Sequence, residues 1–318
     1  MLHVTNGDAA AGKMRAAGIE GEILPWRDVL HDGPVPAGLP LAELSAVRAR
    51  FIADGDWDEE IARQFEERDR ALAGYRGHDE TVLWFEHDLY DQLQLAQVLD
   101  FLGEEALGAT RLTLVCGAEY LGNSAPARLA ERFAERSEVT EAEMLLARDA
   151  WAAFRSPDPT AIVALLDEDS SALPFLAAAL ERHLEQFPSV RNGLSRSEQQ
   201  ALEAIAAGAE TVRDAYLASH PRREDPIWLG DSWFGWYLQN LAAGPSPLVR
   251  LEGNGAGGDE DAVLSHRVAL TDAGRAVMDG REDHVRLNGI DRWLGGVHLH
   301  GRESPWRWDT EVARLVAT

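Results

Sequence analysis

The sequence contains a single cysteine, Cys116, among its 318 residues. One cysteine cannot form an internal disulfide, and no Cys/His spacing typical of a zinc site occurs. No run approaches the roughly 20 apolar residues that a membrane span requires. The N-terminus also lacks a basic segment followed by an apolar one, the pattern of a secretory signal. These absences predict a cytoplasmic protein with no transmembrane segment.

Basic residues are scarce, because 30 Lys and Arg stand against 54 Asp and Glu, a formal net charge of −24. A surface of this sign repels phosphate backbones, whereas nucleic-acid binding usually requires a basic patch. The composition therefore argues against nucleic acid as a partner. Apolar residues still make up 45% of the chain, so a sizeable core is expected. At about 150 residues per domain, the length predicts roughly two domains.

Short apolar runs alternate with amphipathic segments in the first half of the chain. Strands alternating with helices indicate βαβ units and a parallel sheet. Residues 1–150 should therefore form an α/β domain with an open, mostly parallel sheet. The predicted strands are residues 2–5, 22–26, 81–88 and 112–116, and the predicted helices are 9–17, 41–53, 57–74 and 89–103.

The second half has a different pattern. Residues 151–190 resemble a helical connector interrupted by prolines. In residues 191–285, three helices precede two short strands that flank a glycine-rich loop, which is the order of an α+β winged-helix-like domain. Ser195 and Glu198 have the spacing of a capping box, and Asp231 or Ser232 is expected to cap the third helix. Residues 286–318 form a Trp-rich tail predicted to dock across the domains.

The predicted third helix of this winged-helix-like domain has no Lys or Arg. A helix that reads DNA normally carries such residues for phosphates and guanines. Its aromatic residues, Trp233, Phe234, Trp236 and Tyr237, instead favour packing or contact with a protein partner.

The stretch "NGDAAAGKM" has the glycine and lysine spacing of a phosphate-binding loop. A working loop carries Ser or Thr directly after the lysine, because that hydroxyl holds Mg²⁺. Here Met14 follows Lys13 and cannot do so. The sequence between Gly7 and Gly12 also favours helix. We expect Asp8 to cap a helix that contains Gly12 and Lys13, and no Walker-type hydrolysis of nucleotides.

Polar side chains gather where the first three predicted strands end. In open parallel sheets, ligands bind beyond the carboxyl ends of the strands. Carboxylates there suit a divalent metal such as Mg²⁺ or Mn²⁺, and His suits acid/base chemistry. The candidate metal ligands are Asp8, Asp28, Asp32, Glu86 and Asp88; the candidate catalytic residues are His31 and His87, with Arg27 as an anion clamp; and Asn6, Gly7, Trp26 and Tyr90 are candidate ligand-binding residues.

Each of these residues also has a structural interpretation. Asp8 and Asp88 sit where a helix cap would, and Asp32 opens an ordinary Asp-Gly-Pro turn. Glu86 and His87 could be satisfied by internal hydrogen bonds. No G-x-S-x-G nucleophile motif occurs, and Cys116 at the end of the fourth strand is expected to be a buried, inert thiol.

Three strings occur in order over about the first 120 residues: "HVTNGD", "LPWRDVLHDGPVP" and "LWFEHDLYDQLQL". Together they resemble the bacterial domain-of-unknown-function family 1835. The later strings "LSRSEQQAL" and "NGIDRWLGG" look like the C-terminal half found beside that domain in some members. The resemblance implies membership of the family and brings no activity with it.

Two functions remain open from the sequence. The first is a metal-dependent hydrolase or transferase that acts on a phosphate-containing substrate at the carboxyl edge of the N-terminal sheet. The second is a non-catalytic regulatory or adaptor protein, which binds a small ligand and contacts a protein partner through its C-terminal domain. Convergence of the polar side chains within metal-binding distance would favour the first.

Overall fold

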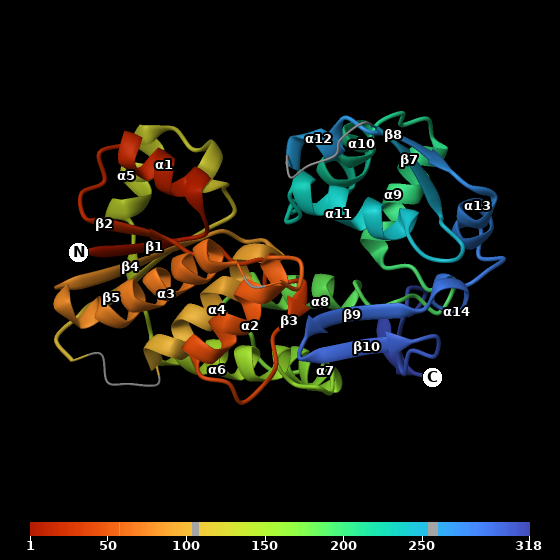
Figure 1. The fold of residues 1–318 in the computed structure, drawn as a ribbon. Helices are drawn as coiled ribbons and strands as arrows, with labels where there is room; N and C mark the ends of the chain where they lie inside the picture. Colours follow the sequence, from red (N-terminus) through yellow and green to blue (C-terminus); the bar gives the residue numbers. More distant parts are fainter. Residues whose placement is uncertain (57, 104–107, 254–259) are drawn as a thin grey trace. The chain divides into compact units, whose positions relative to one another are not determined.

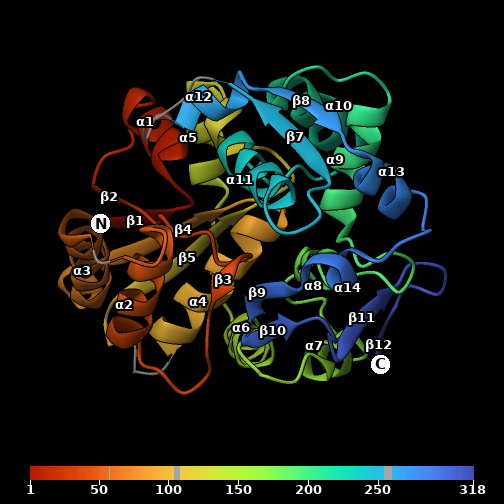
Figure 2. The same ribbon diagram turned by 45° about the vertical axis from the view of Figure 1, so that its right-hand side comes forward.

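The computed structural model describes residues 1–56, 58–103, 108–253 and 260–318 (Figures 1 and 2). Unit 1 comprises Met1–Glu181 and Trp293–His298, and unit 2 comprises Arg182–Arg292 and Leu299–Thr318. Most of the predicted glycine-rich loop, residues 254–259, lies outside the described residues. Of the helices in the described ranges, none is both long enough and apolar enough to cross a bilayer.

A five-stranded sheet forms the centre of unit 1, in the order β2-β1-β4-β5-β6. The first four of these strands are parallel, and only the short edge strand β6 pairs antiparallel, with β5. The fold is therefore mixed α/β with a mostly parallel N-terminal sheet, as the sequence predicts. The strands are β1 (Leu2–Thr5), β2 (Glu22–Pro25), β4 (Glu80–Phe85), β5 (Arg111–Cys116) and β6 (Ser137–Glu138).

Helices cover both faces of this sheet (Figure 1). All six residues of β4 are buried, which is why its sequence is a nearly continuous apolar run. Val82 and Trp84 share a core cluster with Met14 of α1 and Leu129 of α5. The helices of unit 1 are α1 (Asp8–Ala16), α2 (Leu41–Ile52), α3 (Glu59–Ala73), α4 (Leu89–Gly103), α5 (Pro126–Ala134), α6 (Glu141–Phe154) and α7 (Thr160–Leu166), with 3₁₀ turns η1 (Gly74–Gly77) and η2 (Leu121–Asn123).

The strand order creates a switch point between β1 and β4. The chain leaves β1 towards β2 on one side, and later returns to β4 on the other side of β1. The helix after β1 packs on one face of the sheet, with α5, and α4 lies on the opposite face (Figures 1 and 2). A crevice outside the carboxyl ends of two such strands is the usual ligand site of open α/β sheets.

The phosphate-loop match at the N-terminus is part of a helix. Gly12 and Lys13 lie inside α1, and the side chain of Met14 is fully buried in the core. The expected cap by Asp8 is wrong, since Gly7 is the N-cap and makes no side-chain hydrogen bond. Asp8 instead accepts two hydrogen bonds from Arg27, with N···O distances of 2.6 and 2.7 Å.

We therefore expect no hydrolysis of Mg²⁺-ATP that depends on Lys13. The amides from Ala11 onward are bonded within α1, so the second half of the glycine and lysine pattern cannot cradle a phosphate, and no hydroxyl follows the lysine. Phosphate release by the wild type and by Lys13→Ala should be equal. A rate above the protein-free blank that Lys13→Ala abolishes would contradict this interpretation of α1.

In unit 2, three of the helices precede an antiparallel strand pair, β7 with β8. Ser195 and Glu198 form the predicted capping box of α9. The predicted cap of α11 is wrong, because Gly230 is its N-cap and Asp231 accepts from the amide of Ser232 instead. The elements are α9 (Arg196–Ala206), α10 (Val212–Arg223), α11 (Asp231–Ala242), β7 (Val249–Glu252), α12 (Glu260–Leu264), β8 (Arg267–Leu270), α13 (Asp272–Met278) and α14 (His284–Asn288).

The C-terminal segment adds short strands. β9 (Ile290–Gly295) pairs in parallel with β3 (Gly33–Pro34), in a three-stranded sheet of order β10-β9-β3. On this hairpin the rings of Trp293 and His298 stack at 4.4 Å. The remaining elements are α8 (Leu176–Leu184), β10 (Val297–Gly301), β11 (Trp306–Asp309) and β12 (Arg314–Ala317).

Candidate metal centre

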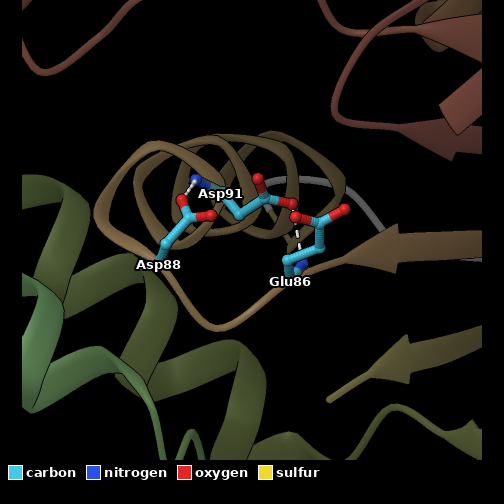
Figure 3. Close-up of side chains that lie close together, drawn as sticks. All are labelled: Glu86, Asp88 and Asp91. Atoms are coloured by element: carbon cyan, nitrogen blue, oxygen red, sulfur yellow. Dashed lines mark hydrogen bonds between the residues drawn. The ribbon is translucent and has the colours of Figure 1, made fainter. Parts of the chain in front are cut away.

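Three buried carboxylates meet where β4 ends. Glu86 and Asp88 lie in the loop between β4 and α4, and Asp91 lies in the first turn of α4 (Figure 3). Each residue offers one carboxylate oxygen, and these oxygens lie within 4.8 Å of one another. Their exposed fractions are 4%, 4% and 1%. We refer to these three residues as the acidic triad.

Local hydrogen bonds explain why the three acids converge. The amide of Glu86 donates to Oδ1 of Asp91 at 2.6 Å, and the amide of Asp91 donates to Oδ1 of Asp88 at 3.1 Å (Figure 3). These bonds satisfy the free amides at the end of the strand and at the start of the helix. The loop and the first turn of α4 therefore hold each other in one conformation.

Neighbouring segments complete the site. Asn6, directly after β1, donates from Nδ2 to Oδ2 of Asp91 at 2.9 Å. The Tyr90 hydroxyl donates to the carbonyl of Asn6 at 3.1 Å. The amide of Leu121 in η2 donates to Oε1 of Glu86 at 2.6 Å. The triad therefore lies at the carboxyl ends of β1 and β4, which is the switch point of the sheet.

Burial raises the pKa of all three carboxyl groups. It raises the pKa of Asp88 to about 7, with the charge of Glu86 adding to the effect against opposing backbone hydrogen bonds. It raises the pKa of Asp91 well above its ordinary value, and the charges of Asp88 and Glu86 raise it further. It also raises the pKa of Glu86, despite hydrogen bonds that lower it. Such a group of acids is stabilised either by protons or by a cation.

Carboxylate oxygens are the ligands that Mg²⁺ and similar hard cations prefer. One oxygen from each triad residue would coordinate such an ion and leave its other positions for water or substrate. The donor set and the spacing therefore fit a divalent cation. The sequence predicts Glu86 and Asp88 among five candidate ligands; the structure places these two together with Asp91.

Asp8 and Arg27 form a separate, exposed pair with each other. Their side chains are 65% and 51% exposed, and their shortest N···O distance is 2.6 Å. The hydrogen bond from Arg27 lowers the pKa of Asp8. Gly7 is the N-cap of α1. Asp8 is thus an ion-pair partner in the first turn of α1 and takes no part in the acidic triad.

Asp28 and Asp32 belong to a second buried cluster, organised by Arg48. The Arg48 guanidinium is fully buried and donates from Nε to Oδ1 of Asp28 at 2.9 Å. It also donates to the carbonyls of Asp32 at 2.8 Å and Val29 at 3.0 Å. Trp26 is buried beside this cluster and donates from Nε1 to Gln97 at 2.8 Å. The loop after β2 is therefore fastened to α2, and these groups do not join the triad.

The two candidate histidines lie in aromatic surroundings. The ring of His31 is 6.0 Å from that of Tyr90, and the ring of His87 is 5.3 Å from that of Tyr120. His87 also meets Phe175 edge-on at 5.8 Å. Of the twelve predicted site residues, the structure thus gathers Asn6, Glu86, Asp88 and Tyr90 around Asp91, with His31 next to Tyr90.

The sequence prediction did not include Asp91 among the candidate ligands. The available signal was spacing, because residues three apart at a helix start lie on one side of it, and Asp88 and Asp91 have that spacing. It also missed Arg48, whose position on an amphipathic helix gives no sign of burial.

No family model matches the chain, and the search of curated proteins also found no match. The chemistry of the acidic triad and its surroundings is therefore the basis for assigning a function.

Proposed function

We propose that the acidic triad binds a divalent cation, Mg²⁺ or Mn²⁺, in a metal-dependent hydrolase or transferase that acts on a phosphate-containing substrate. One observation carries the proposal. Three carboxylates from residues that are at most 4% exposed place oxygens within 4.8 Å of one another at the switch point of a parallel sheet. That crevice is where such sheets bind their ligands.

The energetics favour an ion in this position. Adjacent carboxylates removed from water repel each other, and near neutral pH they take up protons unless positive charge compensates them. A bound divalent cation supplies that charge, and it would polarise a phosphoryl oxygen or lower the pKa of a water ligand. His31 and His87 are the candidate acid/base residues. His87 is the better placed for a substrate, since its ring contacts Phe175, which lines a pocket beside the triad.

A titration with Mn²⁺, monitored through the electron paramagnetic resonance signal of the free ion, tests the proposal. Wild-type protein at pH 8 should bind one Mn²⁺ per chain. Glu86→Gln and Asp88→Asn keep the side-chain shape and an acceptor oxygen, and each should weaken binding by about tenfold or more. Asp149→Asn makes the same chemical change at an exposed position on α6 and should bind as the wild type does.

Circular dichroism of each variant would show that the fold is retained. The proposal fails if the wild type binds no stoichiometric Mn²⁺ at pH 8, or if the triad variants bind it as tightly as Asp149→Asn.

A regulatory or adaptor protein is the second candidate, and two observations favour it. Each triad carboxylate already accepts a backbone amide, as bracing of a loop would require. In unit 2, Trp233 and Trp236 stack at 5.3 Å on α11, which suits a protein partner. We propose a winged-helix-like arrangement for this unit from its order of three helices and a strand pair. Under this function the chain shows no response to Mn²⁺.

We also propose membership of the family 1835. Its support is the three strings in the N-terminal half, one of which, "LWFEHDLYDQLQL", contains the whole acidic triad.

A further inference from the structure

A pocket of about 430 Å³ opens beside the acidic triad, at the carboxyl end of β5. Gln92 and Cys116 line it, and both contact the backbone that carries the triad. Gln92 donates from Nε2 to the carbonyl of Glu86 at 2.6 Å, and Sγ of Cys116 lies 3.8 Å from the same oxygen. The volume is in the range of small-molecule sites, about 300–1,000 Å³.

Three arginines line this pocket at intervals of four residues along and just beyond α5. Two of them are neutralised. Arg128 pairs with Glu119 at 2.9 Å, and Arg136 pairs with Glu80 at 2.7 Å. The third, Arg132, is the exception.

The Arg132 residue is only 6% exposed, and its guanidinium has no carboxylate within ion-pair distance among the described residues. Nη1 donates to the carbonyl of Glu119 at 3.1 Å, while the buried Nη2 has no hydrogen-bond partner in the described part of the chain. A buried guanidinium left in this way retains unused donors, and such a group binds carboxylates and phosphates strongly.

Gly117 allows the guanidinium to lie at this position. A Cβ atom at residue 117 would stand 2.8 Å from Nη2 of Arg132 and 3.6 Å from Cζ. The chain directly after β5 is therefore open where the unpartnered nitrogen lies. A side chain there would push the guanidinium away.

We propose that this pocket is a phosphate subsite, in which Arg132 binds the phosphate group of a small organic phosphate next to the triad. The inference deepens the proposed function. A role of this subsite in the reaction rests on the proposed function, whereas phosphate binding by Arg132 rests only on the pocket and its lining. A cation on the triad and an anion on Arg132 would attract each other, so each should bind more tightly in the presence of the other.

The alternative is a purely structural role, in which Arg132 serves as a distant counter-charge to Glu86. The charge of Arg132 does lower the pKa of Glu86. That role needs a positive charge at this place but no open donor, and it predicts no response to phosphate.

The proposal is tested by phosphorus NMR of inorganic phosphate in the presence of the full chain. The spectra are recorded once with EDTA and once with Mg²⁺. Wild-type protein should broaden or shift the signal at matched ionic strength, with saturation. Arg132→Met should weaken binding by about tenfold or more, because charged hydrogen bonds are lost. Arg132→Lys should lie between the two, and Gly117→Ala should weaken binding without removing any charge. Arg148→Met removes an exposed arginine on α6 outside the pocket; it is the control and should bind as the wild type does.

The outcomes separate this inference from the proposed function. Phosphate binding that depends on Arg132 and Gly117, in a protein that ignores divalent ions, supports the subsite and removes the metal centre. The subsite is overturned, and the metal centre is left standing, if Mn²⁺ binds at the triad while phosphate binds in neither buffer. The same holds if phosphate binds but Arg132→Lys and Gly117→Ala do not change its affinity. If Arg132→Met does not fold, Arg132→Lys and Gly117→Ala decide whether the subsite exists.

Discussion

Replacement of Arg48 by methionine should lower the free energy of unfolding of unit 1 by about 3–5 kcal/mol, the usual effect of breaking a buried ion pair from one side. Methionine fills much of the space but leaves Asp28 buried with Arg68 as its remaining cation, at 3.8 Å. The carbonyls of Val29 and Asp32 lose their donors as well. Hydrogen exchange of the amides of α2 measures the loss.

Arg50→Met is the matched control, since Arg50 is exposed on the same helix. It should change stability by less than about 0.5 kcal/mol, as surface substitutions usually do. Asp28→Asn should cost less than Arg48→Met and should reduce the further cost of Arg48→Met in the double variant, because the two share one interaction. If Arg48→Met costs no more than Arg50→Met, the cluster around Arg48 does not hold the loop after β2.

The sheet was predictable because its signal is local. The apolar run of β4 is buried on every residue, and Pro25 falls at the end of the edge strand β2, where its missing amide costs no ladder bond. The helix caps were harder to predict from the sequence. Asp8 is a good N-cap by residue type, yet both of its carboxylate oxygens accept hydrogen bonds from Arg27 instead. A competing partner 19 residues away leaves no trace in the local pattern.

The composition of the candidate site followed the same division. Asn6, Glu86 and Asp88 could be grouped because parallel strands bring their ends to one edge. Asp28 and Asp32 were grouped with them on the same reasoning, although Arg48 binds Asp28 and the Asp32 carbonyl instead. Sequence gives the strand that a residue follows, but it does not give the side chain that reaches it from another helix.

The phosphate subsite shows the same limit from the opposite side. Arg128, Arg132 and Arg136 are equivalent in the sequence, since each follows the previous one by four residues. Only their partners distinguish them: Glu119 and Glu80 neutralise two, and Arg132 has one carbonyl as its hydrogen-bond partner among the described residues. Which member of a repeated pattern carries an unused charge is a property of the folded chain.

The pH dependence of stability gives the largest expected effect at the triad itself. In metal-free protein, the pKa of Asp88 is raised from 3.8 to about 7 by burial. The folded state therefore binds this proton more tightly than the unfolded state does. Its contribution to stability is complete below about pH 4, declines as the pH rises towards 7, and is lost above that.

Asp88→Asn should remove this decline, because an amide stays neutral and still accepts the amide of Asp91. In EDTA at pH 8, the variant should exceed the wild type in free energy of unfolding by roughly 2–4 kcal/mol, and near pH 4 the two should be similar. Urea denaturation followed by tryptophan fluorescence measures both. Asp149→Asn should follow the wild-type curve at every pH.

Addition of Mn²⁺ at pH 8 should then narrow this difference in the free energy of unfolding. A ligand at 100 times its dissociation constant stabilises the native state by about 2.7 kcal/mol, and the wild type should gain this while Asp88→Asn gains little. A triad that only braces the loop would keep the pH effect and show no gain from Mn²⁺ in either protein. Absence of the decline between pH 4 and 7 would mean that Asp88 is ionised throughout, and a compensating positive charge would then have to lie within reach of the triad even without a metal.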